Sequence, residues 1–534
     1  MPDAFNVRLN TLENKLYQLI ISRLDGDKVA SKNYQEKIIE LVKKGIGGFI
    51  LFGGKKDEIR DFIGKIQSIS EIPLFIASDI ERGVGQQIKN ALVFPCQMAM
   101  AAATNKNKPE DVSILRSAIK AMADEAKDIG INMPLIPVLD VNQNPDNPII
   151  CTRAFSDNPE DVAWFGSEYI KILETSGLIS CAKHFPGHGD TAIDSHISLP
   201  VITKSRNDLM TTDIMPFFEA IKTGVSSIMV GHLSVPAIDL KPASLSRKII
   251  TDLLRKELGF DGLILSDALN MDALKDIENI PIECFNAGID ILLHPVDADN
   301  TVKKLLFALD ENKISEEQID EAVDRIVKIK ARLQNFIMAE VDHKQHIKLS
   351  EHIIEMSISL VKHKAGLLPI SDFNRVHAVL AGDKTLYESS LLRDYFRHIT
   401  TTNENVIPPT PPLLKGGKGG LLKERGEMGL VEGSTEEFLD EIIVFAIFTS
   451  ISAWKGKSGI DDEQSHQITE LIRKAKISIV ISFGSPYVLS RFKEADVLIA
   501  AYEATEQAQK AVIRCLTGEK DFKGKLPVIL NIKP

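Results

Sequence analysis

One repeated unit dominates residues 17–295 and limits the folds open to this chain. Each copy is a short apolar run that ends in a polar or charged residue, followed by a longer segment with helical periodicity. Eight consecutive β/α units favour an α/β fold with a closed parallel (β/α)8 barrel of the TIM type over an open doubly wound sheet. The first run is ambiguous, because residues 12–24 fit a helix equally well. The runs are YQLIISRLDG, GIGGFILFGG, IPLFIASDIE, INMPLIPVLD, LISCAKHFPG, VSSIMVGHLS, DGLILSDALN and GIDILLHPVD.

A second α/β region follows the eighth run. We predict a barrel domain over residues 1–338, a polar linker over 339–350, and a smaller, sandwich-like α/β domain over 351–534. The second domain should be an open sheet with helices on its faces. Residues 406–433 are rich in proline and glycine, contain the near repeat LLKGGKGGLLK, and predict a disordered insert. The strand candidates of this domain are RVHAVLAG, EIIVFAIF, ISIVISFG, DVLIAAYE and LPVIL.

Composition excludes several classes of partner. The 534 residues include 63 Lys and Arg against 74 Asp and Glu, a formal net charge of -11, which argues against nucleic acid. No apolar run approaches the ~20 residues that a membrane helix needs, so we expect no membrane partner. The N-terminal residues lack the pattern of a secretory signal, which predicts a cytoplasmic protein if the chain is the complete precursor. Five scattered cysteines without paired spacing indicate reduced packing residues.

Polar residues stand where the apolar runs end. Active residues of (β/α)8 barrels come from the C-terminal ends of different strands. A single polar residue leaving a strand is explained at least as well by structure alone, but six runs in succession make coincidence less attractive. These runs end on Asp79 and Glu81, on Asp140, on Lys183 and His184, on His232, on Asp267 and on His294.

The loop KHFPGHGDTAIDSHISLP, residues 183–200, has the highest density of chemically active side chains. Asp194 and His196 lie two residues apart, and a carboxylate beside an imidazole is the arrangement that orients and tunes a general acid/base. Three histidines and two aspartates could also bind zinc. Their spacing is irregular and no HExxH motif is present, so we predict no metal site. For His188 we expect a structural role, in which its side chain braces the long loop.

The same loop resembles the defining motif of the β-N-acetylhexosaminidase branch of glycoside hydrolase family 3, in its two-domain form. The segments DVNQNPDNPIICTRAFS, PASLSR and LGFDGLILSDALNM resemble further blocks of that branch, in the same order. The resemblance implies a retaining mechanism in which Asp267 is the nucleophile that forms a glycosyl-enzyme. His196 would be the acid/base, with Asp194 as its partner, and no cofactor would be required. By the same matches, the residues that hold the sugar would be Asp79, Arg153, Lys183, His184 and His232.

The resemblance therefore implies an exo-acting β-N-acetylglucosaminidase that removes terminal β-linked N-acetylglucosamine (GlcNAc), with peptidoglycan-derived fragments as the expected substrate. Alternatives are a β-glucosidase, a β-xylosidase or a GlcNAc phosphorylase of the same family, and a non-catalytic sugar-binding protein. The chain departs from the branch in DIERGVGQQ, where Arg82 replaces a glycine and Val84 and Gln87 replace arginines. This departure bears on the leaving-group side of the substrate. The sequence does not specify an oligomeric state.

Overall fold

The structure is a computed structural model that describes residues 11–337, 341–396, 398–402, 442–451, 455–456 and 458–532. The insert predicted over 406–433 lies outside the described residues. The contacts divide the chain into two compact units, which take alternating stretches of the sequence. Unit 1 comprises Met1–Ser359, Ser450–Ser458 and Phe522–Ile529, and unit 2 comprises Leu360–Thr449, Gly459–Asp521 and Leu530–Pro534.

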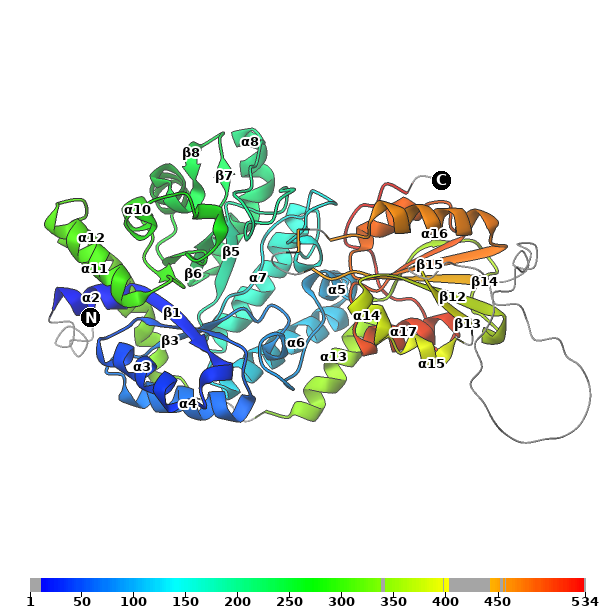
Figure 1. The fold of residues 1–534 in the computed structure, drawn as a ribbon, viewed down its shortest axis with the longest axis horizontal. Helices are drawn as coiled ribbons and strands as arrows, with labels where there is room; N and C mark the ends of the chain where they lie inside the picture. The colour runs from blue at the N-terminus through cyan, green and yellow to red at the C-terminus, as the bar shows by residue number, and fades with distance from the viewer. Residues whose placement is uncertain are drawn as a thin grey trace, which may run out of the picture. The chain divides into compact units, whose positions relative to one another are not determined.

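Unit 1 is built on parallel strands, and each of the eight apolar runs contains one of them (Figure 1). One sheet has the order β10-β1-β2-β3-β4 and a second has the order β5-β6-β9. Single parallel bridges, Val138 with Lys183 and Leu265 with Ile291, join the two sheets at both ends. The strand pairings of unit 1 therefore lead back to their starting point. The strands are β1 (Ile20–Asp25), β2 (Gly48–Phe52), β3 (Phe75–Ser78), β4 (Met133–Pro134), β5 (Cys181–Phe185), β6 (Ser227–Val230), β9 (Leu263–Ser266) and β10 (Leu292–Leu293).

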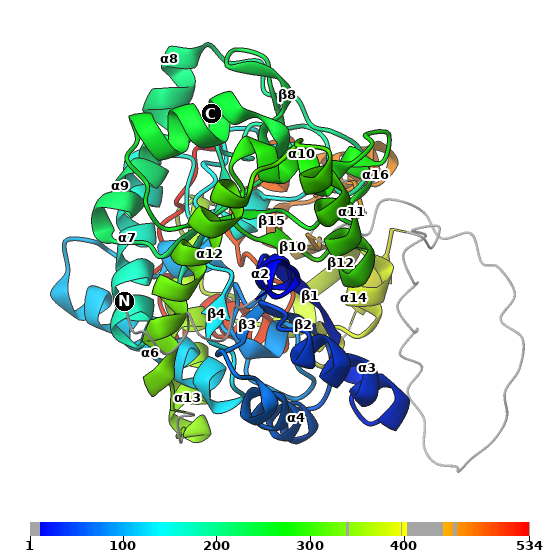
Figure 2. The same ribbon diagram turned by 90° about the vertical axis from the view of Figure 1, so that its left-hand side faces the viewer.

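Helices surround these strands, as Figure 2 shows for α3, α4, α6, α7, α10, α11 and α12. A short antiparallel hairpin, β7 (Ser234–Val235) with β8 (Asp239–Pro242), follows β6. The helices of unit 1 include α2 (Leu12–Gln18), α3 (Lys32–Lys43), α4 (Lys56–Ile69), α5 (Gln97–Ala102), α6 (Pro109–Asp128), α7 (Pro159–Thr175), α8 (Arg206–Asp208), α9 (Met215–Thr223), two π-helices (Leu209–Asp213 and Lys248–Glu257), α10 (Ile280–Ala287), α11 (Ala298–Asp310), α12 (Glu316–Lys330) and α13 (His343–Ser357).

The ambiguous first run forms both a helix and a strand. Thr11 caps α2 by accepting a hydrogen bond from the amide of Asn14, and the helix ends at Gln18. Strand β1 begins at Ile20 and pairs with β2 and β10. Apolar residues are buried in both elements, which is why the run satisfies the helical and the extended pattern at once.

The region predicted as a linker, 339–350, overlaps helix α13. Asp342 caps this helix by accepting from the amide of Gln345, and Ile353 and Ile354 are buried. The polar pattern in the sequence belongs to the exposed residues of the first turns of α13. The division between the two units falls later, between Ser359 and Leu360.

Unit 2 contains one six-stranded sheet in the order β11-β16-β15-β14-β12-β13. In Figure 1, helix α16 lies on one face of this sheet and α14, α15 and α17 lie on the other. The central strands are the apolar runs that the sequence predicts, whereas the edge strands β11 and β13 are partly exposed and carry a weaker apolar pattern. The elements are β11 (Ser359–His363), β12 (Val376–Gly382), α14 (Lys384–Glu388), α15 (Leu392–Tyr395), β13 (His398–Thr401), β14 (Ile442–Phe448), α16 (Asp462–Lys474), β15 (Ile477–Phe483), β16 (Val497–Ala500) and α17 (Glu506–Leu516).

The fifth strand candidate, LPVIL, is not a strand of this sheet, and that prediction is wrong. Its residues belong mostly to the segment Phe522–Ile529 of unit 1. The carbonyl of Pro527 accepts a hydrogen bond from Ser156 Oγ at 2.5 Å, and the amide of Ile529 donates to Asp157 Oδ2 at 2.6 Å. Proline cannot donate to a strand ladder, and these contacts use the backbone instead.

The cysteines and the apolar character of the helices were also assessed from the sequence. All five cysteines are buried thiols that form no disulfide, as the sequence predicts. Among the helices of the described residues, none combines the length and the apolar character that crossing a membrane requires.

Candidate active site

A cavity of about 390 Å³ opens at the carboxyl ends of the strands of unit 1. Its walls include most of the side chains that the sequence singles out, although they are spread over nearly 200 positions. The adjacent carboxyl ends of parallel strands bring them together. The predicted site residues that line it are Asp79, Arg153, Lys183, His184, His196 and Asp267.

Asp267 follows directly after β9 and borders the cavity. Its amide donates to the carbonyl of Val230 at 3.0 Å, and its Oδ1 accepts from the amide of Ala268 at 2.8 Å. Burial raises the pKa of Asp267, but the nearby imidazoles of His232 and His184 and the amide of Ala268 more than offset this effect, so the pKa lies below its ordinary value. A carboxylate held ionised in this position can act as a nucleophile.

His232 lies behind the wall of the cavity. Its Nε2 lies 3.2 Å from the carbonyl oxygen of Ala268, which can only accept, so Nε2 carries the proton. Its Nδ1 then accepts from Ser244 Oγ at 2.8 Å. Burial lowers the pKa of His232, and the Asp267 carboxylate only partly counteracts it. Both nitrogens thus have protein partners, and the ring supports the backbone next to Asp267.

Asp194 and His196 form the pair that their spacing predicts. His196 Nδ1 lies 2.8 Å from Asp194 Oδ1, and the His196 amide donates to the same oxygen at 2.9 Å. The Asp194 side chain is fully buried, while that of His196 is 26% exposed and borders the cavity. Asp194 therefore fixes the Nδ1–H tautomer, and proton exchange with a bound molecule falls to Nε2.

Glu81 links the buried Lys183 and the partly exposed Arg153 in the wall of the cavity. It accepts from Arg153 Nε at 2.9 Å and from Nη2 at 2.8 Å, and Lys183 Nζ lies 2.8 Å away. Lys183 Nζ also donates to Asp79 Oδ1 at 2.6 Å. Burial raises the pKa of Glu81, but the charges of Arg153 and Lys183 outweigh it and hold this pKa well below its usual range. Asp79, Glu81, Arg153 and Lys183 thus form one charge network.

Asp140 orients the second imidazole of the cavity. Its Oδ2 lies 2.7 Å from His184 Nδ1, and its Oδ1 accepts from the backbone amides of His184 and His188. Asp140 is fully buried, which raises its pKa, but the two histidines lower it further than burial raises it. Glu81 and Asp140 both end apolar runs in the sequence. Only the structure shows that Glu81 pairs with Arg153 and Lys183 and that Asp140 orients His184.

His188 is held neutral in the interior. Thr191 Oγ1 donates to the His188 carbonyl at 3.0 Å and therefore accepts from His188 Nδ1 at 2.7 Å. Nε2 has no hydrogen-bond partner among the residues that the structure describes. Burial lowers the pKa of His188 to about 4.

This burial predicts a loss of stability in acid. The unfolded chain binds a proton at His188 near pH 6.5 and the folded chain only near pH 4, so stability is complete above pH 6.5 and falls as the pH drops. The contribution of His188 to this loss is about 3 kcal/mol at pH 4. We expect His188→Asn, which keeps a donor for Thr191, to flatten the pH dependence of urea unfolding between pH 7 and 4. His352→Asn, at an exposed position of α13, should leave the profile unchanged. Parallel profiles for wild type and His188→Asn would contradict this account.

One residue of the cavity comes from a distant part of the sequence. Ile451 borders the cavity and lies in Ser450–Ser458, which belongs to unit 1 although β14 of unit 2 precedes it. In the sequence, Ile451 continues the apolar run of β14 and carries no sign of a site. Phe52, the last residue of β2, and His294, directly after β10, also border the cavity.

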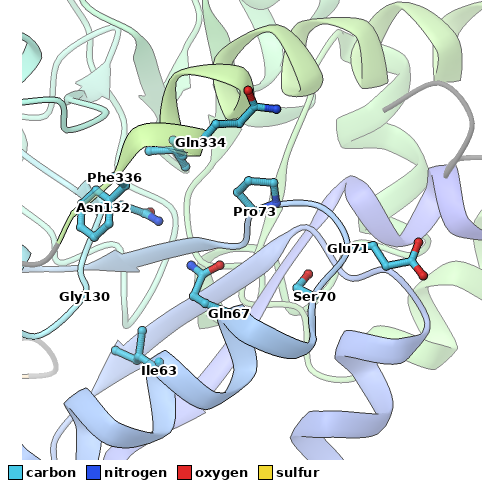
Figure 3. A pocket seen from close by; sticks show the side chains of 11 residues that line it. Ile63, Gln67, Ser70, Glu71, Pro73, Gly130, Asn132, Gln334 and Phe336 are labelled. Atoms are coloured by element: carbon cyan, nitrogen blue, oxygen red, sulfur yellow. The ribbon is translucent and has the colours of Figure 1, made fainter. Parts of the chain in front are cut away.

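A larger cavity of about 510 Å³ lies elsewhere in unit 1 (Figure 3). Ile63 and Gln67 project toward it from α4, and Pro73 and Asn132 line it just before β3 and β4 begin. It therefore lies at the amino ends of these strands. None of the site residues predicted from the sequence lines it, and it contains no acid/base pair, so size alone does not identify the active site.

The fold, the cavity and its charged groups agree with a match to a known family. Residues 11–329 match the family described as glycosyl hydrolase family 3 N terminal domain. The chain belongs to glycoside hydrolase family 3 and is a glycoside hydrolase. This confirms the family that the sequence motifs resemble.

Several known proteins are similar to the chain over most of its length or a large part of it. The chain is 33% identical to "Beta-hexosaminidase A" of Pseudoalteromonas piscicida over 95% of its own length and 93% of the relative. It is 30% identical to "Beta-N-acetylglucosaminidase/beta-glucosidase" of Cellulomonas fimi over 61% of each chain. A solved family 3 β-N-acetylglucosaminidase from Paenibacillus sp. str. FPU-7 is 26% identical, with a TM-score of 0.76, covering 98% of this chain and 100% of that one. A β-glucoside phosphorylase has a TM-score of 0.82 at 22% identity, covering 99% and 96%, a likeness of fold alone.

Proposed function

We propose that the protein is a retaining exo-β-N-acetylglucosaminidase that removes terminal β-linked GlcNAc. The observation that carries this proposal is the meeting of Asp267 and the Asp194–His196 pair at one cavity. The names of the relatives support the choice of an N-acetylated sugar. Peptidoglycan-derived fragments are the proposed natural substrate.

The proposal includes the architecture that presents these residues. The closed circuit of strand pairings makes a (β/α)8 barrel, with residues 1–338 as the catalytic domain. The smaller α/β domain lies within residues 351–534, with its insert at 406–433, although residues up to 359, 450–458 and 522–529 belong to unit 1. In this arrangement the catalytic residues leave the carboxyl ends of β5 and β9 and point into the same opening.

The reaction proceeds in two displacements. The Asp267 carboxylate attacks the anomeric carbon, the bond to the leaving oxygen breaks, and that oxygen takes a proton from His196 Nε2. The glycosyl-enzyme then reacts with water, which gives its proton to His196 while its oxygen bonds to the anomeric carbon and Asp267 leaves. Two inversions retain the configuration. Asp194 holds the imidazole in one tautomer and stabilises its charged form.

The charge network makes an imidazole the better acid/base here. Retaining enzymes usually place a second carboxyl about 5 to 5.5 Å from the nucleophile. The cavity carboxylate Glu81 is held ionised by Arg153 and Lys183, so it cannot supply a proton near neutral pH. His196 is paired with Asp194.

The same network binds the sugar in this proposal. Lys183, Arg153 and His184 donate to hydroxyl and acetamido oxygens, and Asp79 accepts from hydroxyls, in charge-assisted hydrogen bonds that select geometry. His232 positions the backbone of Asp267 from behind. Gln87, which stands where relatives of the branch have an arginine, donates to the Asp79 carbonyl at 3.2 Å and supports the same loop.

The assignment of His196 predicts a dependence on the leaving group. We expect His196→Ala to lower kcat/KM for chitobiose, a poor leaving group, by about 10² to 10⁴-fold. The loss on p-nitrophenyl β-GlcNAc should be much smaller, because nitrophenolate departs without a proton. Asp194→Asn should show the same trend more weakly. Equal losses on both substrates would remove His196 from the acid/base role.

Steady-state hydrolysis also decides between sugars. Wild-type enzyme should prefer p-nitrophenyl β-GlcNAc to the corresponding β-glucoside and β-xyloside. A preference for either of these would overturn the substrate assignment. A rate that requires inorganic phosphate and yields a sugar phosphate would make the enzyme a phosphorylase.

A further inference from the structure

Two helices of unit 1 bring four metal-ligating side chains together, away from the catalytic cavity. Glu125 and Asp128 lie three residues apart in the last turns of α6, and His343 and His346 have the same spacing in the first turn of α13. Residues three apart share one face of a helix. Helix α6 ends before β4 begins, so the cluster lies toward the amino end of that strand, whereas the catalytic residues follow carboxyl ends.

The side chains converge closely. His343 Nδ1 and His346 Nδ1 each lie 2.8 Å from Glu125 Oε1, and His343 Nε2 lies 3.7 Å from Asp128 Oδ2. One ligand atom each of Glu125, Asp128 and His343 lies within 4.8 Å of the others. Ligand atoms about 2.1 Å from one zinc ion are at most about 4.2 Å apart. Small side-chain rotations would therefore bring these three onto one ion, and His346, which contacts Glu125, is the candidate for a fourth ligand.

Both carboxylates are buried, and their charges are balanced differently. Asp128 is paired with Arg60 Nη1 at 2.8 Å and with Lys56. Lys56 Nζ lies against Asp128 Oδ2, and no other described group donates a hydrogen bond to that oxygen. Glu125, only 2% exposed, forms no ion pair with Lys or Arg in the described part of the chain, and it contacts the two histidines instead. A buried carboxylate without a cation is costly, and a bound metal ion would supply the missing positive charge.

We propose that Glu125, Asp128, His343 and His346 bind one divalent transition-metal ion, with zinc as the best fit. Two imidazole nitrogens and two carboxylate oxygens are a ligand set that zinc accepts in tetrahedral geometry. Lys56, whose side chain is 25% exposed and contacts His343 Nε2 at 2.8 Å, turns outward when the ion enters. The ion neutralises Glu125 and joins α13 to α6. Its role is structural, because the cluster is separate from the catalytic residues.

The test uses the intact chain after treatment with a chelator. Isothermal titration calorimetry with ZnSO₄ counts the zinc sites. The visible d–d absorption bands of bound Co²⁺ report tetrahedral coordination. The double variant His343→Gln/His346→Gln should lose one site. Its affinity should fall at least about 100-fold, because loss of groups that only support a ligand already costs about 10- to 100-fold. His352→Gln, an exposed histidine of the same helix, should bind like wild type.

Lys56→Gln separates a metal site from an ordinary ion-pair cluster. It keeps all four ligands and removes the competing cation, so zinc affinity should rise by about tenfold and zinc should raise the melting temperature more than in wild type. Histidines of the catalytic cavity could also bind zinc, but such a site would remain in the double variant. Unchanged stoichiometry in the double variant would overturn the proposal. So would the absence of zinc binding by both wild type and Lys56→Gln.

Discussion

Replacement of Asp267 by alanine is expected to lower kcat on p-nitrophenyl β-GlcNAc by about 10⁴-fold or more, the scale on which removal of a covalent nucleophile acts. Two features make Asp267 the group to test: the Ala268 amide bound to Oδ1 and a pKa held below its ordinary value keep the carboxylate ionised. Initial rates under substrate saturation provide the measurement. Asp261→Ala removes a 91% exposed carboxylate near the start of β9 and should leave kcat unchanged.

Azide distinguishes the nucleophile from the acid/base. In Asp267→Ala, azide can enter the space that the carboxylate leaves and form a bond to the anomeric carbon, so the product should be the α-glycosyl azide. In His196→Ala the glycosyl-enzyme still forms, and azide attacks it from the opposite face to give the β-anomer. Formation of the β-azide by Asp267→Ala, or activity within tenfold of wild type, would assign the nucleophile to another group, such as the acetamido oxygen of the substrate.

Loss of Glu81 should cause the largest change in stability. Glu81→Ala leaves Arg153 without its bidentate partner and Lys183 with Asp79 alone, at sites where both cations are largely shielded from water. Breaking a buried ion pair on one side typically costs about 3 to 5 kcal/mol. We expect a decrease of that order in the free energy of unfolding, measured by urea denaturation at pH 7.

The stabilisation by Glu81 should depend on pH. Because the pKa of Glu81 is lowered in the folded protein, its stabilising effect is complete above about pH 4.5 and is lost as the pH falls. The difference between wild type and Glu81→Ala should therefore shrink in acid. Glu58→Gln, in an exposed pair with Lys55, is the matched control and should change stability little. Equal stability of Glu81→Ala and wild type at pH 7 would show that Arg153 and Lys183 do not need this carboxylate.

The strands, helix caps and side-chain contacts that depend on residues close together in the sequence could be predicted from the sequence. Each apolar run contains a strand because burial on both faces requires continuous apolar residues, and the capping box at Ser315 begins α12 because it is a local hydrogen-bond pattern. The contact between Asp194 and His196 is equally local. LPVIL failed as a strand because an apolar run can also lie in an extended segment that pairs with no sheet.

The sequence by itself determined the repeat, the polar residues at the strand ends, the pairing of Asp194 with His196 and the family. Only the tertiary structure decided which of these groups meet. Glu81 contacts Arg153 across 72 positions, Ile451 enters the cavity from beyond β14, and α13 brings His343 to Glu125 across 218 positions. The spacing of apolar residues indicates which side of a helix or strand is buried, but it does not indicate which other helix or strand packs against that side. The partner depends on the order and register of the strands, which many weak contacts set together.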